Sequence, residues 1–258
     1  MHAHIVVAHP EVNSYNAHLA ATARQALEQT GAGVTVSDLY RMNFDPCERA
    51  SHYSQRLDAT HFDVQAEQRH ASTNGAIPPD IAAEIARLEQ ADLLILQYPM
   101  WWHLPPAMLK GWLDRVFIYG DVYNSKQRFE SGRFTGKKAM LSVTVGTSRE
   151  TYGYNGRSGD IDLLLWPINF SLAYVGYGVL KPFVAYGVEA GLRYSEPAAV
   201  EARLRRIETE WAAAVTGIDQ RPELPFNKMA HWGADGRTKP DAPVYSPFIR
   251  KKEHLEIE

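Results

Sequence analysis

The stretch from Asp92 to Phe117, DLLILQYPMWWHLPPAMLKGWLDRVF, constrains the fold of this chain more than any other. It begins with an apolar run, Leu93–Leu96, and so short a run suits a strand that is buried on both faces. An aromatic segment follows, and from Pro105 onward apolar residues recur at helical spacing, with proline in the favoured first turn. The stretch therefore predicts a strand, a loop and a helix. The loop lies at the carboxyl end of the strand, where open α/β sheets bind ligands.

Two adjacent tryptophans, Trp101 and Trp102, occupy this loop. Their flat π surfaces and indole N–H groups suit a planar aromatic ligand. The alternative is that both rings are ordinary core or subunit contacts, because large aromatic side chains dominate protein interiors. We expect Trp102 to face a ligand ring and Trp101 to pack elsewhere.

The composition is that of a globular protein, with 258 residues, of which 45% are hydrophobic and 22% charged. The formal net charge of -3 gives no reason to expect nucleic acid or an anionic membrane as a partner. A lone cysteine, Cys47, fits a reducing compartment. The first residues lack the pattern of a signal peptide, and no apolar run approaches membrane-spanning length. We expect a soluble, cytoplasmic protein without membrane insertion.

Strand and helix patterns alternate along most of the chain, which predicts an α/β fold with five parallel strands and helices on both faces. The expected strands are 5–8, 34–39, 93–96, 138–145 and 178–186. The expected helices are 17–29, 80–90, 106–117, 160–175 and 197–215.

Two segments fall outside this alternation. Residues 47–79 run without clear periodicity, and we interpret this excursion as a segment that covers a ligand. From Gly217 onward Pro, Gly and charged residues dominate, which predicts an extended tail packed on a surface. The predicted division is a catalytic domain over 1–216 and a C-terminal tail over 217–258.

Three loops are expected at the same edge of the sheet, after Ala8, Gln97 and Val145. The chain has no G-x-G-x-x-G or Walker motif, so a phosphate in the first loop would depend on Asn13, Ser14 and backbone N–H groups at a helix N-terminus. Simple helix capping is the alternative for these two residues. A phosphate-compatible loop beside an aromatic loop and a glycine loop describes a flavin pocket. The histidines lack a recognised metal-ligand spacing, so no metal is expected.

The chain resembles the NAD(P)H:quinone oxidoreductase (DT-diaphorase-like) family of flavodoxin-like flavoproteins. The resemblance is carried by AHPEVNSYN, DLYRMNFDP, the QYPMWWHLPPAMLKGWLDRVF block, GRFTGKKAMLSVTVGTSRETY, LLLWPI and VLKP. It implies a sheet order of 2-1-3-4-5, bound FAD (with FMN as the alternative) and a homodimer with an active site at each subunit boundary. It also implies NAD(P)H as co-substrate and ping-pong hydride transfer through flavin N5 to a quinone or a similar aromatic acceptor.

The resemblance also assigns residues. Those matched to cofactor binding are His9, Asn13, Ser14, Tyr15, Asn16, Phe62, Asp63, Pro99, Met100, Trp101, Trp102, His103, Thr144, Val145, Gly146, Thr147 and Tyr152. Those matched to catalysis are Tyr152, Gly146 and Tyr123, and the matched substrate pocket comprises Trp102, His103, Tyr123, Ser125 and Ser158.

Two positions depart from the family pattern. Ser125 stands where the family has a second pocket tyrosine, and Ser158 stands where it has the histidine that works with Tyr152. Serine can donate a hydrogen bond but cannot become a cation. Arg149 or Arg157 is a candidate replacement, and substrate preference does not carry over.

Two other classes of function stay open at this point. One is a regulatory flavoprotein, such as an ancillary subunit of a transporter with little turnover, because the family contains relatives of that kind. The other is a scaffold that binds no flavin.

Overall fold

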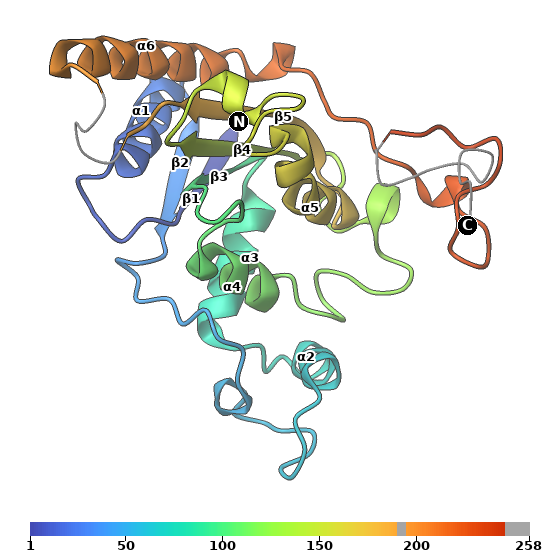
Figure 1. Cartoon of the computed structure of the whole chain (residues 1–258). Helices are drawn as coiled ribbons and strands as arrows, with labels where there is room; N and C mark the ends of the chain where they lie inside the picture. The colour runs from blue at the N-terminus through green and yellow to red at the C-terminus, as the bar shows by residue number, and fades with distance from the viewer. Residues whose placement is uncertain (190–194, 246–258) are drawn as a thin grey trace.

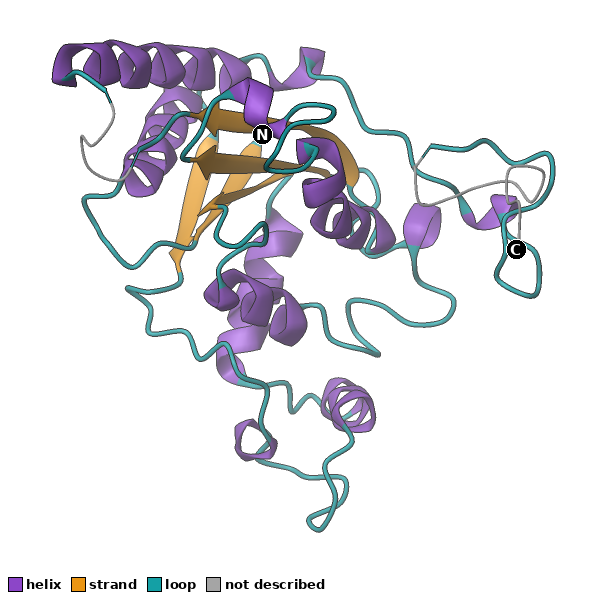
Figure 2. Ribbon diagram, in the orientation of Figure 1, coloured by secondary structure: helices purple, strands orange, loops and turns teal. Residues whose placement is uncertain are grey.

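The computed structural model describes residues 1–189 and 195–245, and in it five parallel strands form one sheet with helices on both faces (Figures 1 and 2). The sheet order is β2-β1-β3-β4-β5, as predicted. The strands are β1 (His2–Val7), β2 (Gly33–Asp38), β3 (Leu93–Pro99), β4 (Lys138–Val145) and β5 (Gly178–Tyr186). The last two coincide with the predicted ranges, and β4 is the clearer case because its residues after Lys138 are all buried.

The helices of the described residues follow the predicted order with one addition, α2. They are α1 (Tyr15–Gln29), α2 (Val64–Thr73), α3 (Pro79–Gln90), α4 (Ala107–Val116), α5 (Ile161–Tyr174) and α6 (Pro197–Thr216).

The two faces of the sheet bury separate apolar clusters, because successive strand residues point to opposite sides. Ile5 and its neighbours in register, Val36 and Ile95, are hydrogen-bonded across the three strands. On this face α1 and α6 cover the sheet, and Trp211 of α6 is fully buried and donates its indole N–H to the Leu19 carbonyl over 2.8 Å. On the other face α3, α4 and α5 pack around Trp112.

The segment 47–79 was predicted to be irregular, and this prediction is wrong because it contains α2. The buried residues of α2 are Glu67, Gln68 and Ala71, so two of the three inward positions are polar. Apolar periodicity, the signal on which helix prediction depends, is therefore absent from this helix.

Glu67 tolerates burial because the loop before α2 surrounds its carboxylate with donors. Arg56 Nε donates to one carboxylate oxygen over 2.7 Å, and the Leu57 N–H donates to the other over 3.0 Å. Buried charges in proteins are paired and hydrogen-bonded in this way. The excursion is thus an ordered unit that its own buried ion pair holds together.

The loop after β2 crosses α4 at a glycine. A Cβ on Gly111 would lie 2.1 Å from the Pro46 carbonyl oxygen, so no other residue type fits at this point of the helix. This contact fixes the start of the excursion against α4.

A buried polar cluster joins β1, β2, α3 and α4 beneath the sheet. The Glu84 carboxylate is fully buried and accepts hydrogen bonds from Ser37 Oγ over 2.9 Å and from Trp112 Nε1 over 2.8 Å. Burial alone would raise the pKa of Glu84, but the neighbouring His4 ring and the Trp112 and Ser37 donors hold it below the ordinary range. The group therefore stays charged and ties the edge strand to the helix layer.

The C-terminal tail passes the outer edge of the sheet around Glu223, and the rest of its described part extends away from the sheet (Figure 1). The Lys181 N–H donates to the Pro222 carbonyl over 2.8 Å, and the Leu224 N–H donates to the Val179 carbonyl over 2.7 Å. These bonds satisfy the open edge of β5, which would otherwise be a template for pairing with other chains. The predicted tail continues to residue 258, and its portion from 246 lies outside the described residues. Among the described helices, none combines the length and apolarity needed to cross a membrane.

Candidate active site

The three predicted loops meet at the carboxyl edge of the sheet. The His9 ring, after β1, contacts the Trp101 ring, after β3, edge to face with ring centroids 5.9 Å apart. The Met100 N–H donates to the Thr144 carbonyl of β4 over 3.0 Å. The prediction that loops from β1, β3 and β4 lie together is confirmed, and their meeting point lies where open α/β sheets bind ligands.

A buried amide network fixes these loops from below. Asn16, which is buried, accepts a hydrogen bond from Gln97 Nε2 over 2.9 Å and donates to Thr144 Oγ1 over 3.0 Å. Three elements, α1, β3 and β4, are thereby joined through one side chain. One of the two Asn16 amide N–H donors and its carbonyl oxygen are engaged in this network, which holds the loops in register.

The aromatic loop is a tight turn with a tryptophan and a histidine at its tip. The Trp101 and Leu104 backbones exchange two hydrogen bonds, of 2.9 and 3.0 Å, around Trp102 and His103. Both central residues have positive φ, 51° at Trp102 and 64° at His103, which is the signature of a type I′ turn. Such turns favour Asn-Gly, and bulky residues are strained there. The Trp102 side chain is 92% exposed, so its ring is available to cover a ligand or a partner.

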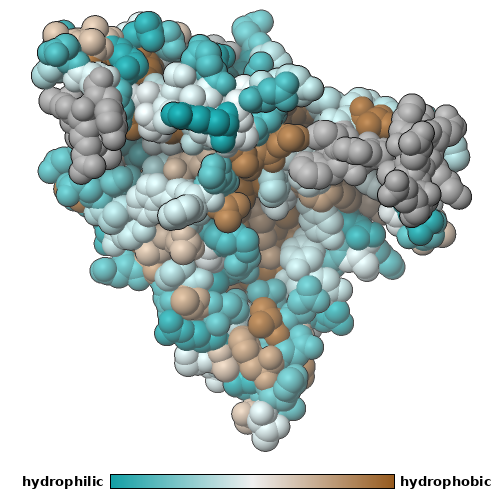
Figure 3. All heavy atoms as spheres, viewed as in Figure 1, coloured by the Kyte–Doolittle hydropathy of each residue, from teal (hydrophilic) through white to brown (hydrophobic). Residues whose placement is uncertain are grey.

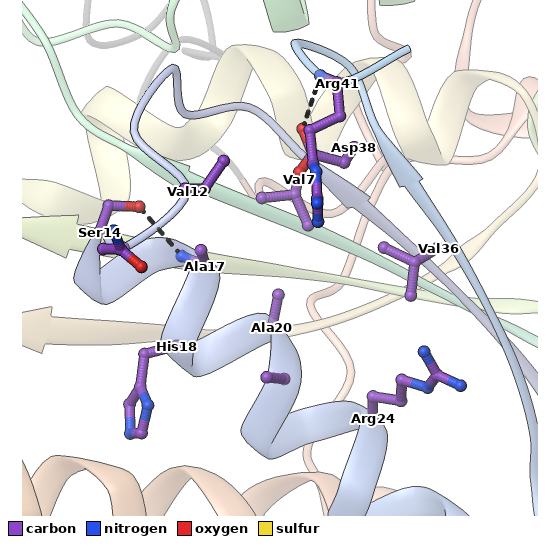
Figure 4. Close-up of a pocket in the computed structure, with 12 residues that line it drawn as sticks. Val7, Val12, Ser14, Ala17, His18, Ala20, Arg24, Val36, Asp38 and Arg41 are labelled. Carbon is purple, nitrogen blue, oxygen red and sulfur yellow. Dashed lines mark hydrogen bonds between the residues drawn. The ribbon is translucent and has the colours of Figure 1, made fainter.

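The first loop forms a capped helix start beside a cavity of about 570 Å³ (Figure 4). Ser14 Oγ accepts a hydrogen bond from the Ala17 N–H over 3.2 Å, so Ser14 is the N-cap of α1. Asn13 lines the same cavity, and Arg24 and Arg41 lie at its rim. The helix dipole and the two guanidinium groups favour an anion here, whereas the Asp38 carboxylate in the same lining opposes one, and Arg24 also pairs with Glu28 over 2.8 Å.

Tyr15 uses its hydroxyl inside the protein. That hydroxyl donates to the Leu204 carbonyl of α6 over 2.6 Å, and the ring stacks on His18. Burial, and to a smaller extent the Glu208 carboxylate, raises the pKa of Tyr15 to about 12. The Tyr15 hydroxyl is therefore engaged within the protein, and a cofactor would meet the backbone or the partly exposed ring of this residue.

The loop after β4 offers two backbone donors. Within the described residues, nothing accepts a hydrogen bond from the backbone N–H of Gly146 or of Thr147. The space beside Gly146 is open, because a Cβ there would meet only the Val188 carbonyl oxygen, at 3.8 Å. Exposed N–H groups after β4 and an exposed indole after the neighbouring strand β3 are the groups that suit the polar edge and the flat face of an isoalloxazine ring, so the residues present fit a flavin.

Tyr152 lies in a 3₁₀ turn, Arg149–Tyr152, directly after this loop. It is partly buried, and burial raises the pKa of its hydroxyl. Ser158 lies beside it, because the Ser158 N–H donates to the Thr151 carbonyl over 2.9 Å. The structure therefore brings Gly146, Thr147, Tyr152 and Ser158 together, as the sequence predicted for one side of a pocket.

A second group of predicted residues lies apart from the loops. Tyr123 packs between Tyr119 and Tyr174, with ring centroids 5.4 and 5.7 Å away. It lines a largely apolar groove of about 770 Å³ between α2, α4 and α5, with Val64 and Phe170. Figure 3 shows apolar surface running down the middle of this face, between α4 and α5. Ser125 is exposed in the segment that follows Tyr123.

Phe62 and Asp63 belong to the start of α2. Phe62 packs against Tyr53 and lies under the Arg56 guanidinium, 5.2 Å from its carbon. Asp63 caps α2 by accepting from the Ala66 N–H over 3.0 Å. Within the described residues, no hydrogen bond, ion pair or ring contact joins either residue to the three loops.

Known proteins share this arrangement over most of the chain. The model of a family with a flavodoxin-like fold matches residues 1–210. The NAD(P)H dehydrogenase [quinone] 1 of Rattus norvegicus is 37% identical over 209 residues, which cover 80% of this chain and 76% of the relative. The human ribosyldihydronicotinamide dehydrogenase [quinone] is 34% identical over 88% of this chain and 95% of its own. A provisionally named quinone reductase structure from Klebsiella pneumoniae superposes with a TM-score of 0.81, at 32% identity over 93% of this chain and 92% of its own.

The chain belongs to the NAD(P)H:quinone oxidoreductase family.

Two arginines near the site were not revealed by the sequence, whereas Arg149 was already a candidate from it. Arg24 and Arg41 are 17 positions apart and line the same cavity because α1 packs beside β2. The guanidinium carbon of Arg149 lies 4.9 Å from the centroid of the Tyr186 ring on β5. None of these contacts has a local sequence signal, since each joins residues from separate elements.

Proposed function

We propose that this protein catalyses the flavin-dependent, two-electron reduction of quinones by NAD(P)H. The observation that carries the proposal is that two loops on the neighbouring strands β3 and β4 present an exposed Trp102 ring and the unpaired backbone N–H groups of Gly146 and Thr147, respectively. The chemistry that a flavin supplies in such a site is the acceptance of a hydride from one ligand and its donation to another. The names of the relatives favour an enzyme over a regulatory subunit.

The chain's own groups have distinct tasks in this reaction. Trp102 and His103 would cover the ring and define the slot in which nicotinamide and quinone bind in turn. The Gly146 and Thr147 N–H groups would donate to the edge of the ring where negative charge develops, and preorganised donors of this kind are effective in a water-poor site. The Tyr152 hydroxyl, whose pKa burial raises, would stay protonated and could donate a hydrogen bond to the same edge.

FAD is the flavin that we propose, held as in the family assignment. Asn13, Ser14 and the N-terminus of α1 would hold the pyrophosphate, with Arg24 and Arg41 adding positive charge nearby. The excursion that carries Phe62 supports FAD over FMN, because an ordered segment beyond the sheet suits an adenine. The lone cysteine, Cys47, is exposed and unpaired, which supports a reducing compartment such as the cytoplasm.

We further propose a homodimer in which each active site is completed by the partner. Tyr123, Ser125, Phe62 and Asp63 are assigned to the cofactor or substrate, yet their contacts lie around α2 and the apolar groove rather than at the three loops. A second copy that presented this groove to the loops would bring both groups together. An exposed apolar groove of this size is also a feature that subunit contacts commonly cover.

The absorbance spectrum of the purified protein tests this function, followed by chromatography of the cofactor released by heating. We expect a flavin spectrum, FAD in the supernatant, and quinone reduction with parallel double-reciprocal lines for NAD(P)H and quinone. Release of FMN would correct the cofactor and retain the reaction. Failure to take up any flavin on reconstitution, or flavin uptake without quinone turnover, would overturn the proposed function.

A further inference from the structure

The turn that carries Tyr152 also presents an arginine on the same side. In a 3₁₀ helix residues three apart are eclipsed, so the side chains of Arg149 and Tyr152 lie one above the other. Both meet the same ring on β5. The Arg149 guanidinium carbon is 4.9 Å from the Tyr186 ring centroid, and the Tyr152 and Tyr186 centroids are 6.4 Å apart. Tyr186 therefore serves as a common support that fixes the guanidinium relative to the Tyr152 hydroxyl.

The surrounding loop holds the turn in place. Thr147 Oγ1 and Thr151 Oγ1 are hydrogen-bonded at 2.5 Å, which ties the turn to the loop after β4. A Cβ on Gly156 would lie 2.4 Å from the Thr151 carbonyl oxygen, so the chain folds back closely over the turn. The position of Arg149 is thus set by the same contacts that set Gly146, Thr147 and Ser158.

The proposed reaction needs a positive charge at this place. NAD(P)H gives up a hydride and leaves as NAD(P)⁺, so the flavin gains two electrons, one proton and one negative charge. The quinone then takes the hydride together with a proton from solvent, and the flavin returns to its neutral oxidised form. Tyr152 and Ser158 can donate hydrogen bonds to the charged form but cannot supply a cation.

We propose that Arg149 supplies the permanent positive charge that stabilises the reduced flavin, in the place of a titrating histidine. This inference rests on the proposed function. An arginine is always charged in proteins, and its planar guanidinium stacks on aromatic rings as it does here on Tyr186. The consequence is that charge compensation at this site does not vary with pH over the physiological range.

Other charged groups near Tyr186 do not replace this role. Asp160 and Asp162 of α5 raise the pKa of the Tyr186 hydroxyl, whereas Arg149 lowers it, and burial has the largest effect, upward. Asp160 is engaged as the N-cap of α5, accepting from the Asp162 N–H over 2.9 Å. Glu150 is exposed, as Arg149 itself is, and Arg149 is one of the groups that lower the pKa of the Glu150 carboxyl. Arg157 is exposed in the same loop, and no hydrogen bond, ion pair or ring contact joins its side chain to another described residue.

The test is the two-electron midpoint potential of the flavin in the intact holoprotein and in four variants. Arg149→Gln should lower the equilibrium constant for reduction about tenfold relative to wild type, a shift of about 30 mV to more negative potential. Arg149→Lys should stay within about threefold of wild type, because it keeps the charge. Arg157→Gln, the matched control, should leave the potential unchanged.

Arg149→His separates a charge effect from a structural one. An imidazole with a pKa near 6.5 is charged at pH 5.5 and neutral at pH 8. All midpoint potentials are compared at the same pH. At pH 5.5 the histidine variant should have the wild-type potential, and at pH 8 it should have the potential of the glutamine variant. A wild-type potential in a flavin-loaded Arg149→Gln protein would overturn the inference. A change in the midpoint potential of Arg149→His, relative to wild type, that is the same at both pH values would also overturn it. This second measurement decides the question if the glutamine variant fails to fold. A wild-type protein that takes up no flavin would instead overturn the proposed function, and this inference with it.

Discussion

Asn16 is a residue of the cofactor loop whose side chain acts on its neighbours rather than on a ligand. Its amide is the bridge between Gln97 of β3 and Thr144 of β4, and it is buried below the loops. Asn13, three positions earlier, is exposed and lines the cavity beside the helix N-terminus. Replacing Asn16 is therefore expected to change the stability of the protein as well as flavin binding, whereas replacing Asn13 should change flavin binding alone.

We predict that Asn16→Ala lowers both the stability of the apo-protein and the affinity for flavin. Gln97 Nε2 and Thr144 Oγ1 would lose a buried partner, which typically costs about 1–3 kcal/mol. Urea unfolding of the apo-protein and a flavin titration measure the two effects. Asn13→Ala is the control, and it should weaken flavin binding while the free energy of unfolding stays within about 0.5 kcal/mol of wild type. An Asn16→Ala protein with wild-type apo stability would show that the bridge does not join these elements.

At the scale of elements, the turn that ends β3 combines an unfavourable backbone with an exposed ring. Positive φ at Trp102 and His103 costs of the order of 1–3 kcal/mol for each residue. The loop bonds between Trp101 and Leu104 hold the turn in this conformation. We interpret the strain as the cost of placing both rings over the ligand.

The double substitution Trp102→Asn with His103→Gly separates the turn from its rings. Asn-Gly is the preferred pair for a type I′ turn, so the thermal stability of the apo-protein should rise, by about 1 kcal/mol or more. Flavin affinity should fall at least tenfold, because the ring that covers the cofactor is lost. Trp102→Phe is the matched control, since it keeps an aromatic ring, and it should bind flavin within a few-fold of wild type. If the double variant binds flavin as tightly as wild type, Trp102 does not cover the ring.

The elements also show what the sequence could and could not predict. Strands such as β3 were predictable because its buried first half, Leu93–Leu96, is an unbroken apolar run, and the meeting of three loops follows from parallel strand order. Helix α2 was not predictable because Glu67 and Gln68 face inward. The turn at Trp102 was equally hidden, since its residues oppose the preference of the turn type.

At the scale of the whole molecule, the proposed site is divided between two regions of the surface. The flavin loops lie at the carboxyl edge of the sheet, and Tyr123 lies in the apolar groove between α2, α4 and α5. The resemblance to the family assigned both regions to one site. The contacts within one chain do not unite them, which is the physical reason to expect that the dimer, rather than the monomer, is the catalytic unit.

Val64 allows the dimer to be tested without disturbing the fold. It is 37% exposed, lines the groove, and is the first residue of α2, where a glutamate is compatible with the helix dipole. Val64→Glu would bury a charge in the proposed interface, so it should convert the dimer to monomer at micromolar concentration and reduce quinone turnover per flavin at least tenfold. Light scattering after gel filtration measures the mass.

Val244→Glu is the matched control, because Val244 is also a valine, is 47% exposed and is not among the residues that line the groove or the cavity beside α1. This control should remain dimeric and active. A Val64→Glu protein that stays dimeric with full turnover would place the subunit contact away from the groove, and the assignment of Tyr123 to a shared active site would fall with it.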